Sequence, residues 1–164
     1  MTLCTIRPIE PGDKPTVEPL LVESWGAVQI YAVALGGLVD ASALPGWIAE
    51  RDGAVAGLIT YLHTGDTIDL VTINSFAPGA GSALLATLTG AAGGLGARRI
   101  RVTTTNDNTR ALRFYQRNGF RLTALRPDAV ARARRHKPQI PEIGADGIPI
   151  RDELDLELAL SPEP

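Results

Sequence analysis

Residues 103–120, TTTNDNTRALRFYQRNGF, constrain the fold of this chain more than any other stretch. The run of threonines ends a β-strand pattern, and residues 106–108 (Asn-Asp-Asn) are types that cap helices by accepting a backbone N–H bond. A short helix is then expected to continue to about Asn118. Gly119 suits the left-handed residue just past a helix end, and Phe120 suits the apolar residue that closes it. The stretch therefore predicts a strand, a short capped helix and an immediate return of the chain.

The side chains on this predicted helix place a small residue beside a phenol. Ala111 and Tyr115 are four residues apart, so they share one face of the helix. Leu112 and Phe114 are expected to point more toward the sheet. The spacing predicts Tyr115 at the mouth of a crevice between a strand and a helix. The alternative is a packed tyrosine whose hydroxyl bonds to the backbone.

A glycine-rich turn, Gly79-Ala80-Gly81-Ser82, lies between an expected strand and an expected helix. Glycines let the backbone turn sharply and approach a ligand closely, and free N–H groups at a helix start attract an anion. No Lys-Ser/Thr pair follows, so the turn is not a P-loop, and Leu84 stands where a dinucleotide fingerprint has its third glycine. By itself the turn indicates an anion site without naming the ligand.

The remaining elements follow from hydrophobic periodicity and turn residues. Strands are expected at 3–7, 46–50, 54–62, 67–75, 98–105, 119–125 and 150–160, and helices at 14–24, from about Gly81 onward, and at 127–138. Residues 46–75 have the pattern of an antiparallel meander, while residues 25–45 show no clear pattern. The last strand alternates charged residues with Leu, as expected for a half-exposed strand at or near a sheet edge.

Length and composition favour one domain over residues 1–164. The net charge of −2 and the scarcity of aromatics disfavour a nucleic-acid partner or an anionic membrane. The lone Cys4 excludes an internal disulfide and a zinc–cysteine cluster, so we expect no metal and a small buried hydrophobe at this position. No stretch is long enough to span a bilayer and the N-terminus has no signal-peptide pattern, so we expect the cytoplasm and no membrane partner.

The pattern Asn108-x-x-Ala111-x-x-Phe114-Tyr115-x-x-x-Gly119-Phe120 closely resembles the second signature of the GCN5-related N-acetyltransferases, the GNAT superfamily. The resemblance implies an α/β fold, a three-layer domain in which helices flank a mixed, mostly antiparallel central sheet. It also implies acetyl transfer from acetyl-CoA to an amine by direct attack in a ternary complex. In that family the tyrosine of the signature protonates the departing CoA thiolate, which gives Tyr115 a catalytic role.

The resemblance assigns acetyl-CoA contacts along the chain. The glycine turn is similar to the family's pyrophosphate loop, and the strand 69–75 supplies main-chain groups for the pantetheine arm and the thioester carbonyl. Phe76 departs from the family pattern, because Arg or Gln stands there in the motif. The cofactor-binding residues predicted in this way are Gly79, Ala80, Gly81, Ser82 and Ala83, then Thr72, Ile73 and Ser75, and finally Asn106, Asn108, Ala111 and Tyr115.

A primary amine must lose a proton before it can attack. Its pKa near 10.4 makes this cost about 4 kcal/mol at neutral pH, and a carboxylate can accept the proton. Asp69 is the candidate base, since it lies inside an apolar strand on the expected face of Val71 and Ile73; the alternative is a structural or solvent-facing Asp. His63 and Glu23 are weaker candidates.

The residues that bind the acceptor are marked by no specific motif in the sequence. The region 25–45 lines the acceptor side in the family, so Trp25 and Tyr31 are candidate substrate-binding residues together with Asn74; both aromatics could equally be ordinary core residues. Residues 126–151 form an insertion before the last strand and resemble a subgroup of uncharacterised bacterial acetyltransferases. Such an insertion could cover the acceptor site.

Three further expectations complete the sequence-based account. The basic run Arg132, Arg134, Arg135, His136 and Lys137 favours a solvated helix face over an anion site. A homodimer is compatible with the family, although the sequence specifies no interface. The alternative function is a CoA-binding or acyl-CoA-binding sensor or interaction module without turnover.

Overall fold

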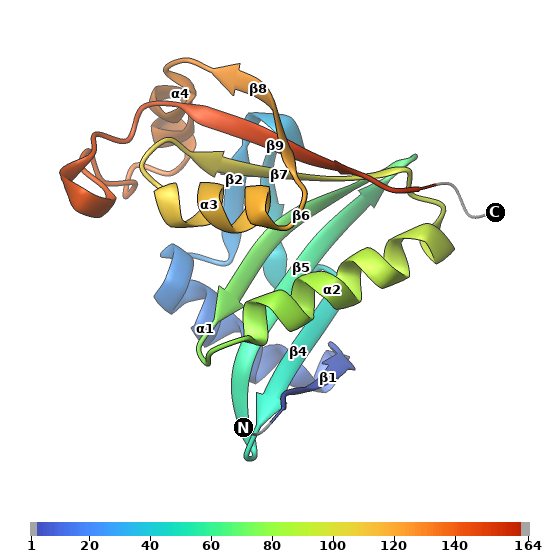
Figure 1. Cartoon of the computed structure of the whole chain (residues 1–164). Helices are drawn as coiled ribbons and strands as arrows, with labels where there is room; N and C mark the ends of the chain where they lie inside the picture. The colour runs from blue at the N-terminus through green and yellow to red at the C-terminus, as the bar shows by residue number, and fades with distance from the viewer. Residues whose placement is uncertain (1–2, 162–164) are drawn as a thin grey trace. The chain divides into compact units, whose positions relative to one another are not determined.

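The computed structural model describes residues 3–161. Its strands are β1 (Thr5–Pro8), β2 (Gln29–Ala32), β3 (Gly37–Asp40), β4 (Gly46–Arg51), β5 (Ala54–Thr64), β6 (Thr67–Ser75), β7 (Arg99–Thr105), β8 (Arg121–Arg126) and β9 (Glu153–Ala159). Its α-helices are α1 (Lys14–Trp25), α2 (Ala80–Ala92), α3 (Thr109–Arg117) and α4 (Ala129–His136) (Figure 1). The predicted elements agree with these bounds to within a few residues, whereas β2 and β3 lie in the region 25–45, for which the sequence predicted no element.

Seven of these strands form one sheet in the order β1-β4-β5-β6-β7-β9-β8, and β2 pairs with β3 in a separate two-stranded sheet. The large sheet is mixed and mostly antiparallel, and the four helices flank it. This confirms the predicted α/β class. The chain divides into two compact units: among the described residues, the first holds 3–30, 40–100 and 160–161, and the second holds Tyr31–Val39 and Arg101–Ala159.

The core of the first unit lies where α2 packs on the meander of β4, β5 and β6, in which each neighbouring pair is antiparallel. Leu58, Leu84 and Leu88 are fully buried there. Gly57 on β5 is required for the close approach of α2. A Cβ at this position would lie 2.7 Å from the carbonyl oxygen of Asn74 and 2.9 Å from Cδ1 of Leu84. Gly57 therefore helps to fix where α2 begins.

A β-bulge interrupts β6 at Val71. Thr72 lies opposite Thr60, whereas Leu70 lies opposite Tyr61, so Val71 has no partner across β5. Because directly opposite residues project to the same face, Asp69 now shares its face with Thr72. The expectation that Asp69 lies on the face of Ile73 is wrong, since it assumed an unbroken alternation through the strand.

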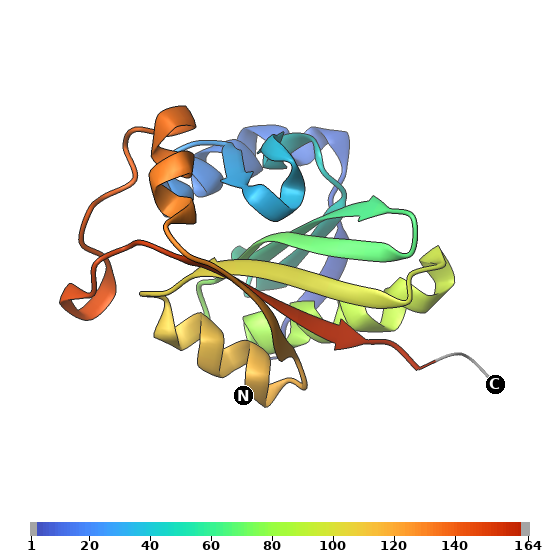
Figure 2. The same cartoon turned by 90° about the horizontal axis from the view of Figure 1, so that it is seen from above.

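The second unit contains β8, β9, α3, α4 and most of β7. β9 lies between β7 and the edge strand β8, and pairs antiparallel with β8. The predicted last strand is thus next to the edge. Figure 2 shows α3 on one face of β7 and β9 and the segment Tyr31–Val39 on the other.

The insertion is a folded part of the second unit. Arg134 of α4 donates hydrogen bonds to the carbonyl oxygens of Ile140, Pro141 and Ile150, at 3.2, 2.7 and 3.0 Å. One half-buried guanidinium therefore holds the loop after α4 against the stretch that leads into β9.

Candidate functional site

The turn between β6 and α2 leaves a directed backbone donor at the helix start. Gly79 adopts φ +82° and is the residue before the first helical position. The N–H of Ala80 donates to a carbonyl of the preceding turn at 3.2 Å, and the N–H of Gly81 donates to Oγ of Ser75 at 3.2 Å. The N–H of Ser82 has no acceptor among residues 3–161. A helix start with such a free, outward donor suits an anion.

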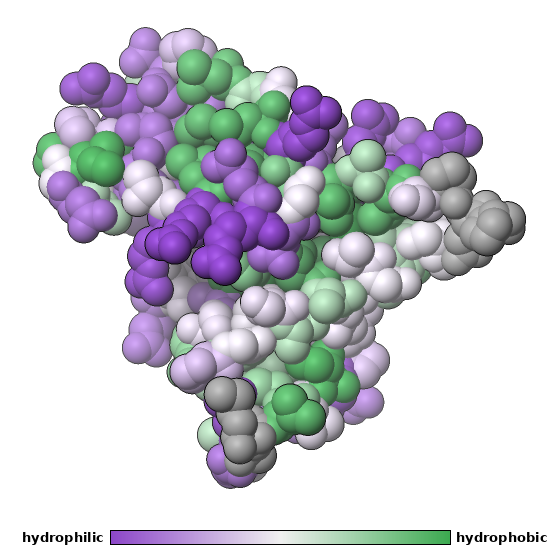
Figure 3. All heavy atoms as spheres, in the orientation of Figure 1, coloured by the Kyte–Doolittle hydropathy of each residue, from purple (hydrophilic) through white to green (hydrophobic). Residues whose placement is uncertain are grey.

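The side chains around this turn carry little charge. Oγ of Ser75 donates to the carbonyl of Ala77 at 3.0 Å while it accepts from Gly81, so it braces the turn. Phe76, at the position where the family motif has Arg or Gln, is 48% exposed. Figure 3 shows the visible face of α2 mostly in white and pale green, the colours of intermediate hydropathy. Anion binding at this turn would therefore depend on main-chain groups.

One face of β6 gathers several predicted site residues. Asp69, Thr72 and Asn74 share this face, and all three are buried. Oγ1 of Thr72 lies 2.6 Å from Oγ1 of Thr60, and Nε1 of Trp25 donates to Oδ1 of Asn74 at 3.2 Å. The structure thus brings together two of the three residues predicted for the acceptor, Trp25 and Asn74.

Sequence reasoning missed the bulge at Val71, which lies beside these residues. A bulge frees main-chain groups that a regular strand would use in its ladder. The resemblance gave the role of polarising a thioester carbonyl to Thr72, Ile73 and Ser75. Because Val71 has no partner across β5, its main chain is a further candidate for that role.

In the second unit, α3 has the predicted start and end. Oδ1 of Asn108 accepts from the N–H of Ala111 at 3.1 Å, which confirms the predicted cap. Gly119 adopts φ +89°, its N–H donates to the carbonyl of Gln116, and the N–H of Phe120 donates to the carbonyl of Tyr115. This is a Schellman motif, and it ends the helix as the sequence predicted.

Tyr115 is the buried residue of α3. It is 3% exposed, and its ring lies 5.3 Å from that of Phe114 and 5.4 Å from that of Phe120, centroid to centroid. Leu112 and Phe114 are only half-buried, contrary to the expectation that they point more toward the sheet. The Schellman motif explains the difference, since it folds Phe120 back against Tyr115.

The ring of Tyr115 is packed, as the alternative expected, but its hydroxyl has no hydrogen-bond partner within the described residues, so the backbone bond of that alternative is absent there. Burial raises the pKa of Tyr115 above its ordinary value near 10. The phenol therefore stays protonated at neutral pH and remains available as a donor.

The side-chain amide of Asn106 is hydrogen-bonded to the insertion and to the residues that follow it, so it is not free to bind a ligand. Its Nδ2 donates to the carbonyl of Pro149 at 2.9 Å, and its Oδ1 accepts from the N–H groups of Arg151 and Asp152 at 2.9 and 3.0 Å. The adjacent Asp107 accepts from the N–H of Ala145 at 3.2 Å. A cofactor contact through the Asn106 side chain would have to replace these bonds.

Substituting Asn106 with Ala should destabilise the protein by roughly 1–3 kcal/mol, because two backbone N–H groups and one carbonyl lose their partner. Urea denaturation would measure the change, and limited proteolysis would detect a loosened insertion. The matched control is Gln116→Ala on the exposed face of α3, which should stay within about 0.5 kcal/mol. Equal stability of the two variants would contradict this assignment.

Tyr31 contacts the insertion. Its ring stacks on that of His136 in α4 at 4.8 Å between centroids, with 18° between the ring planes. Two predicted features, the acceptor-side aromatic Tyr31 and the basic helix, are therefore in contact.

Among the described residues, no three His, Cys, Asp or Glu side chains are grouped so that they could hold a metal ion. Within the same residues no helix is long and apolar enough to cross a bilayer.

Comparison with known proteins decides the family. The sequence model of the Acetyltransferase (GNAT) family matches residues 17–120, which is more than half of the chain. The chain belongs to the GNAT acetyltransferase family. This confirms the resemblance drawn from Asn108 to Phe120, and membership supports acetyl transfer in general.

Two relatives from Bacillus subtilis (strain 168), the uncharacterized proteins YxbD and YdhI, are 37% and 35% identical over 144 residues. In each case the alignment covers 86% of this chain and 89% of the relative. They agree with the predicted likeness to an uncharacterised bacterial subgroup.

Solved GNAT structures share the fold. An IAA acetyltransferase from Bacillus cereus is 24% identical with a TM-score of 0.73, covering 96% of this chain and 99% of the other. A Bacillus subtilis acetyltransferase in complex with CoA is 22% identical with a TM-score of 0.70 at the same coverage.

Proposed function

We propose that the protein is an N-acetyltransferase that moves the acetyl group of acetyl-CoA to an amine by direct attack in a ternary complex. Family membership supports the reaction class, and similar structures that hold CoA or acetyl-CoA support the co-substrate. The observation that carries the proposal is the buried phenol of Tyr115, whose hydroxyl is unpartnered within residues 3–161 and lies on the signature helix.

Tyr115 is proposed as the acid. When the amine nitrogen bonds to the thioester carbon, the carbon–sulfur bond breaks and the sulfur leaves as a thiolate. A thiol has a pKa near 8.5, so a thiolate in an apolar site needs a donor at neutral pH. The phenol of Tyr115 is protonated there and can supply the hydrogen bond and the proton.

The first unit would hold the acetyl-CoA. The diphosphate would bind the main chain of Gly79–Ala83, where the N–H of Ser82 is free within the described chain. Main-chain groups of the bulged strand, from Val71 to Ile73, would contact the pantetheine arm and polarise the thioester carbonyl. Preorganised donors of this kind supply much of the rate in acyl transfer.

The amine also needs a proton acceptor. Asp69 is the candidate that the sequence offered, and it lies buried on the face of β6 that also carries Asn74. Trp25 and Tyr31 remain the proposed acceptor-side aromatics.

A second function is favoured by one observation. The exposed Phe76 removes a polar side chain from the pyrophosphate turn, as expected of a module that binds acyl-CoA loosely and has no turnover. The two functions differ in one assay. Incubation with acetyl-CoA and a panel of primary amines should release CoA thiol in an amine-dependent way if the protein is an enzyme. A sensor would bind acetyl-CoA and release none.

A further inference from the structure

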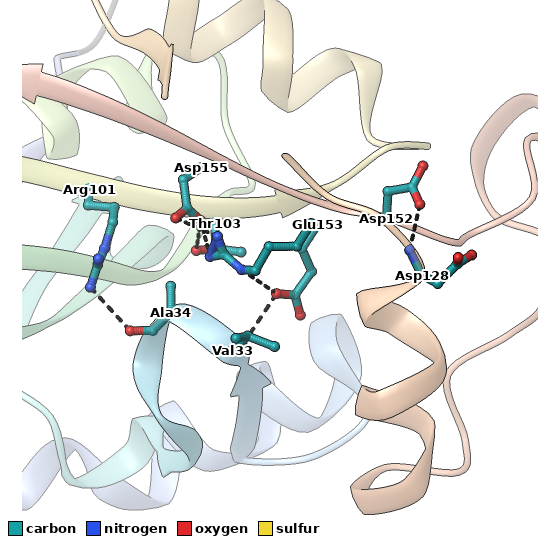
Figure 4. A network of polar contacts seen from close by, with 9 residues as sticks. Val33, Ala34, Arg101, Thr103, Asp128, Asp152, Glu153 and Asp155 are labelled. Atoms are coloured by element: carbon teal, nitrogen blue, oxygen red, sulfur yellow. Dashed lines mark hydrogen bonds and ion pairs between the residues drawn. The ribbon is translucent and has the colours of Figure 1, made fainter. Parts of the chain in front are cut away.

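Two buried carboxylates project from β9 on the face opposite α3. Glu153 is 3% exposed and Asp155 is 5% exposed. Figure 4 shows both side chains, with Thr103 of β7, directed toward the segment that carries Val33 and Ala34. Buried carboxylates are costly unless charges or donors compensate them, so each one requires an explanation.

Asp155 is fully compensated. Nη1 and Nη2 of Arg126 donate to its two oxygens at 2.8 and 2.6 Å, and Oγ1 of Thr103 donates to Oδ1 at 2.7 Å. This bidentate pair, with a third donor, is a structural ion pair. It also commits the guanidinium of Arg126 mainly to Asp155.

Glu153 is held on one side only. Its Oε2 accepts from the N–H of Val33 at 3.3 Å and lies 3.6 Å from Nε of Arg126, which is too long for a hydrogen bond. Its Oε1 has no hydrogen-bond donor among the described residues. One oxygen of a buried carboxylate is therefore left for a donor from outside the protein.

The charges around Glu153 favour a positively charged ligand. Burial raises the pKa of Glu153 above its ordinary value. The charged groups that face it are Arg126 from β8, Asp155 from β9 and Arg132 from α4. Because Asp155 largely neutralises the charge of Arg126, the carboxylate of Glu153 is left without a full compensating positive charge. A cationic donor at Oε1 would supply that charge.

The segment that faces Glu153, residues 31–34, is held by three contacts. The carbonyl of Ala34 accepts from Nη2 of Arg101 at 3.1 Å, the N–H of Val33 is bonded to Glu153, and Tyr31 stacks on His136. This is the segment that the family resemblance places on the acceptor side. Next to this segment, the buried carboxylate of Glu153 has one oxygen without a donor, Oε1, which is suited to bind an amine.

We infer that Glu153 binds the ammonium group of the acceptor through Oε1 and takes its proton, in place of Asp69. The inference rests on the proposed function and narrows it to acceptors whose reacting amine is cationic in solution. It also makes the insertion part of acceptor selection, because α4 contributes Arg132 to the charges that act on Glu153 and His136 to the stack on Tyr31.

The proton balance is complete. Glu153 takes one N–H proton from the ammonium, and the freed lone pair forms the nitrogen–carbon bond with the thioester. The carbon–sulfur bond breaks, and the sulfur takes a proton from Tyr115. The second N–H proton of the attacking nitrogen then restores the phenol through solvent, and Glu153 loses its proton to solvent.

The test is Glu153→Gln, which keeps an acceptor for the N–H of Val33 but removes the charge. The probes are acetyl-CoA with n-propylamine, phenethylamine, 1,4-diaminobutane and glycinamide. We expect kcat/KM at neutral pH to fall about 100-fold or more, and the acid limb of the wild-type pH profile to disappear. The matched control is Glu157→Gln on the same strand, expected within about two-fold of wild type.

Three outcomes decide the inference. Unchanged kcat/KM and an unchanged acid limb in Glu153→Gln, with loss of that limb in Asp69→Asn, would overturn it while the proposed function stands. A wild type that acetylates no amine would overturn both. If Glu153→Gln melts early or loses acetyl-CoA affinity, Glu153→Asp decides: restored turnover supports a role for the charge, and turnover as low as in the Gln variant contradicts it.

Discussion

Replacing Tyr115 with Phe should lower kcat about 100-fold or more while acetyl-CoA affinity stays within about two-fold. The substitution removes only the hydroxyl, which has no partner within the described chain, and keeps the ring between Phe114 and Phe120. Loss of the hydroxyl should therefore cost little stability. The loss in rate reports the proton that the departing thiolate no longer receives.

Thiol release in the presence of a primary amine measures kcat, and calorimetric titration measures acetyl-CoA affinity. Tyr61→Phe is the matched control, because Tyr61 is also a buried tyrosine that stacks on an aromatic ring, that of Trp47. It should keep wild-type turnover. Equal turnover of Tyr115→Phe and Tyr61→Phe would assign Tyr115 a packing role alone.

Substituting Ser82 with Asp should weaken acetyl-CoA binding at least about tenfold and stabilise the free protein by about 0.3–1 kcal/mol. The two effects have opposite signs for one reason. A negative charge in the first turn of α2 interacts favourably with the helix dipole and occupies the place where a diphosphate would bind. Ser82 is exposed, so its substitution leaves the core intact.

Thermal unfolding of the free protein and calorimetric titration would measure both effects of Ser82→Asp. Ala86→Asp is the control, since Ala86 is also exposed and lies one turn further along α2. It should affect acetyl-CoA binding much less. Unchanged affinity in Ser82→Asp would show that the diphosphate does not bind at this helix start.

Local signals in the sequence determine the elements that the sequence predicted well. The cap at Asn108 and the Schellman motif at Gly119 and Phe120 depend on residues within a few positions of one another. The same is true of Gly79, whose left-handed conformation starts α2. Short-range chemistry of this kind is readable without knowledge of the fold.

The parts that the sequence did not predict depend on residues far apart in the chain. The bulge at Val71 appears only when the register of β5 and β6 is known. The hydrogen bond from Val33 to Glu153 joins residues 120 positions apart, and Asn106 reaches its partners over 43 to 46 positions. No spacing pattern in the sequence marks such contacts. Glu153 therefore looked like one more charged residue of an alternating strand.

Calorimetric titration of the protein with acetyl-CoA and with CoA tests the central claim most directly. We expect one molecule to bind per chain with a dissociation constant on the order of micromolar, corresponding to about −8 kcal/mol. Such binding would show that the glycine turn holds the diphosphate although Phe76 replaces the polar residue of the motif. Absence of binding by both ligands would contradict the proposed acetyl transfer and leave only the fold and the family.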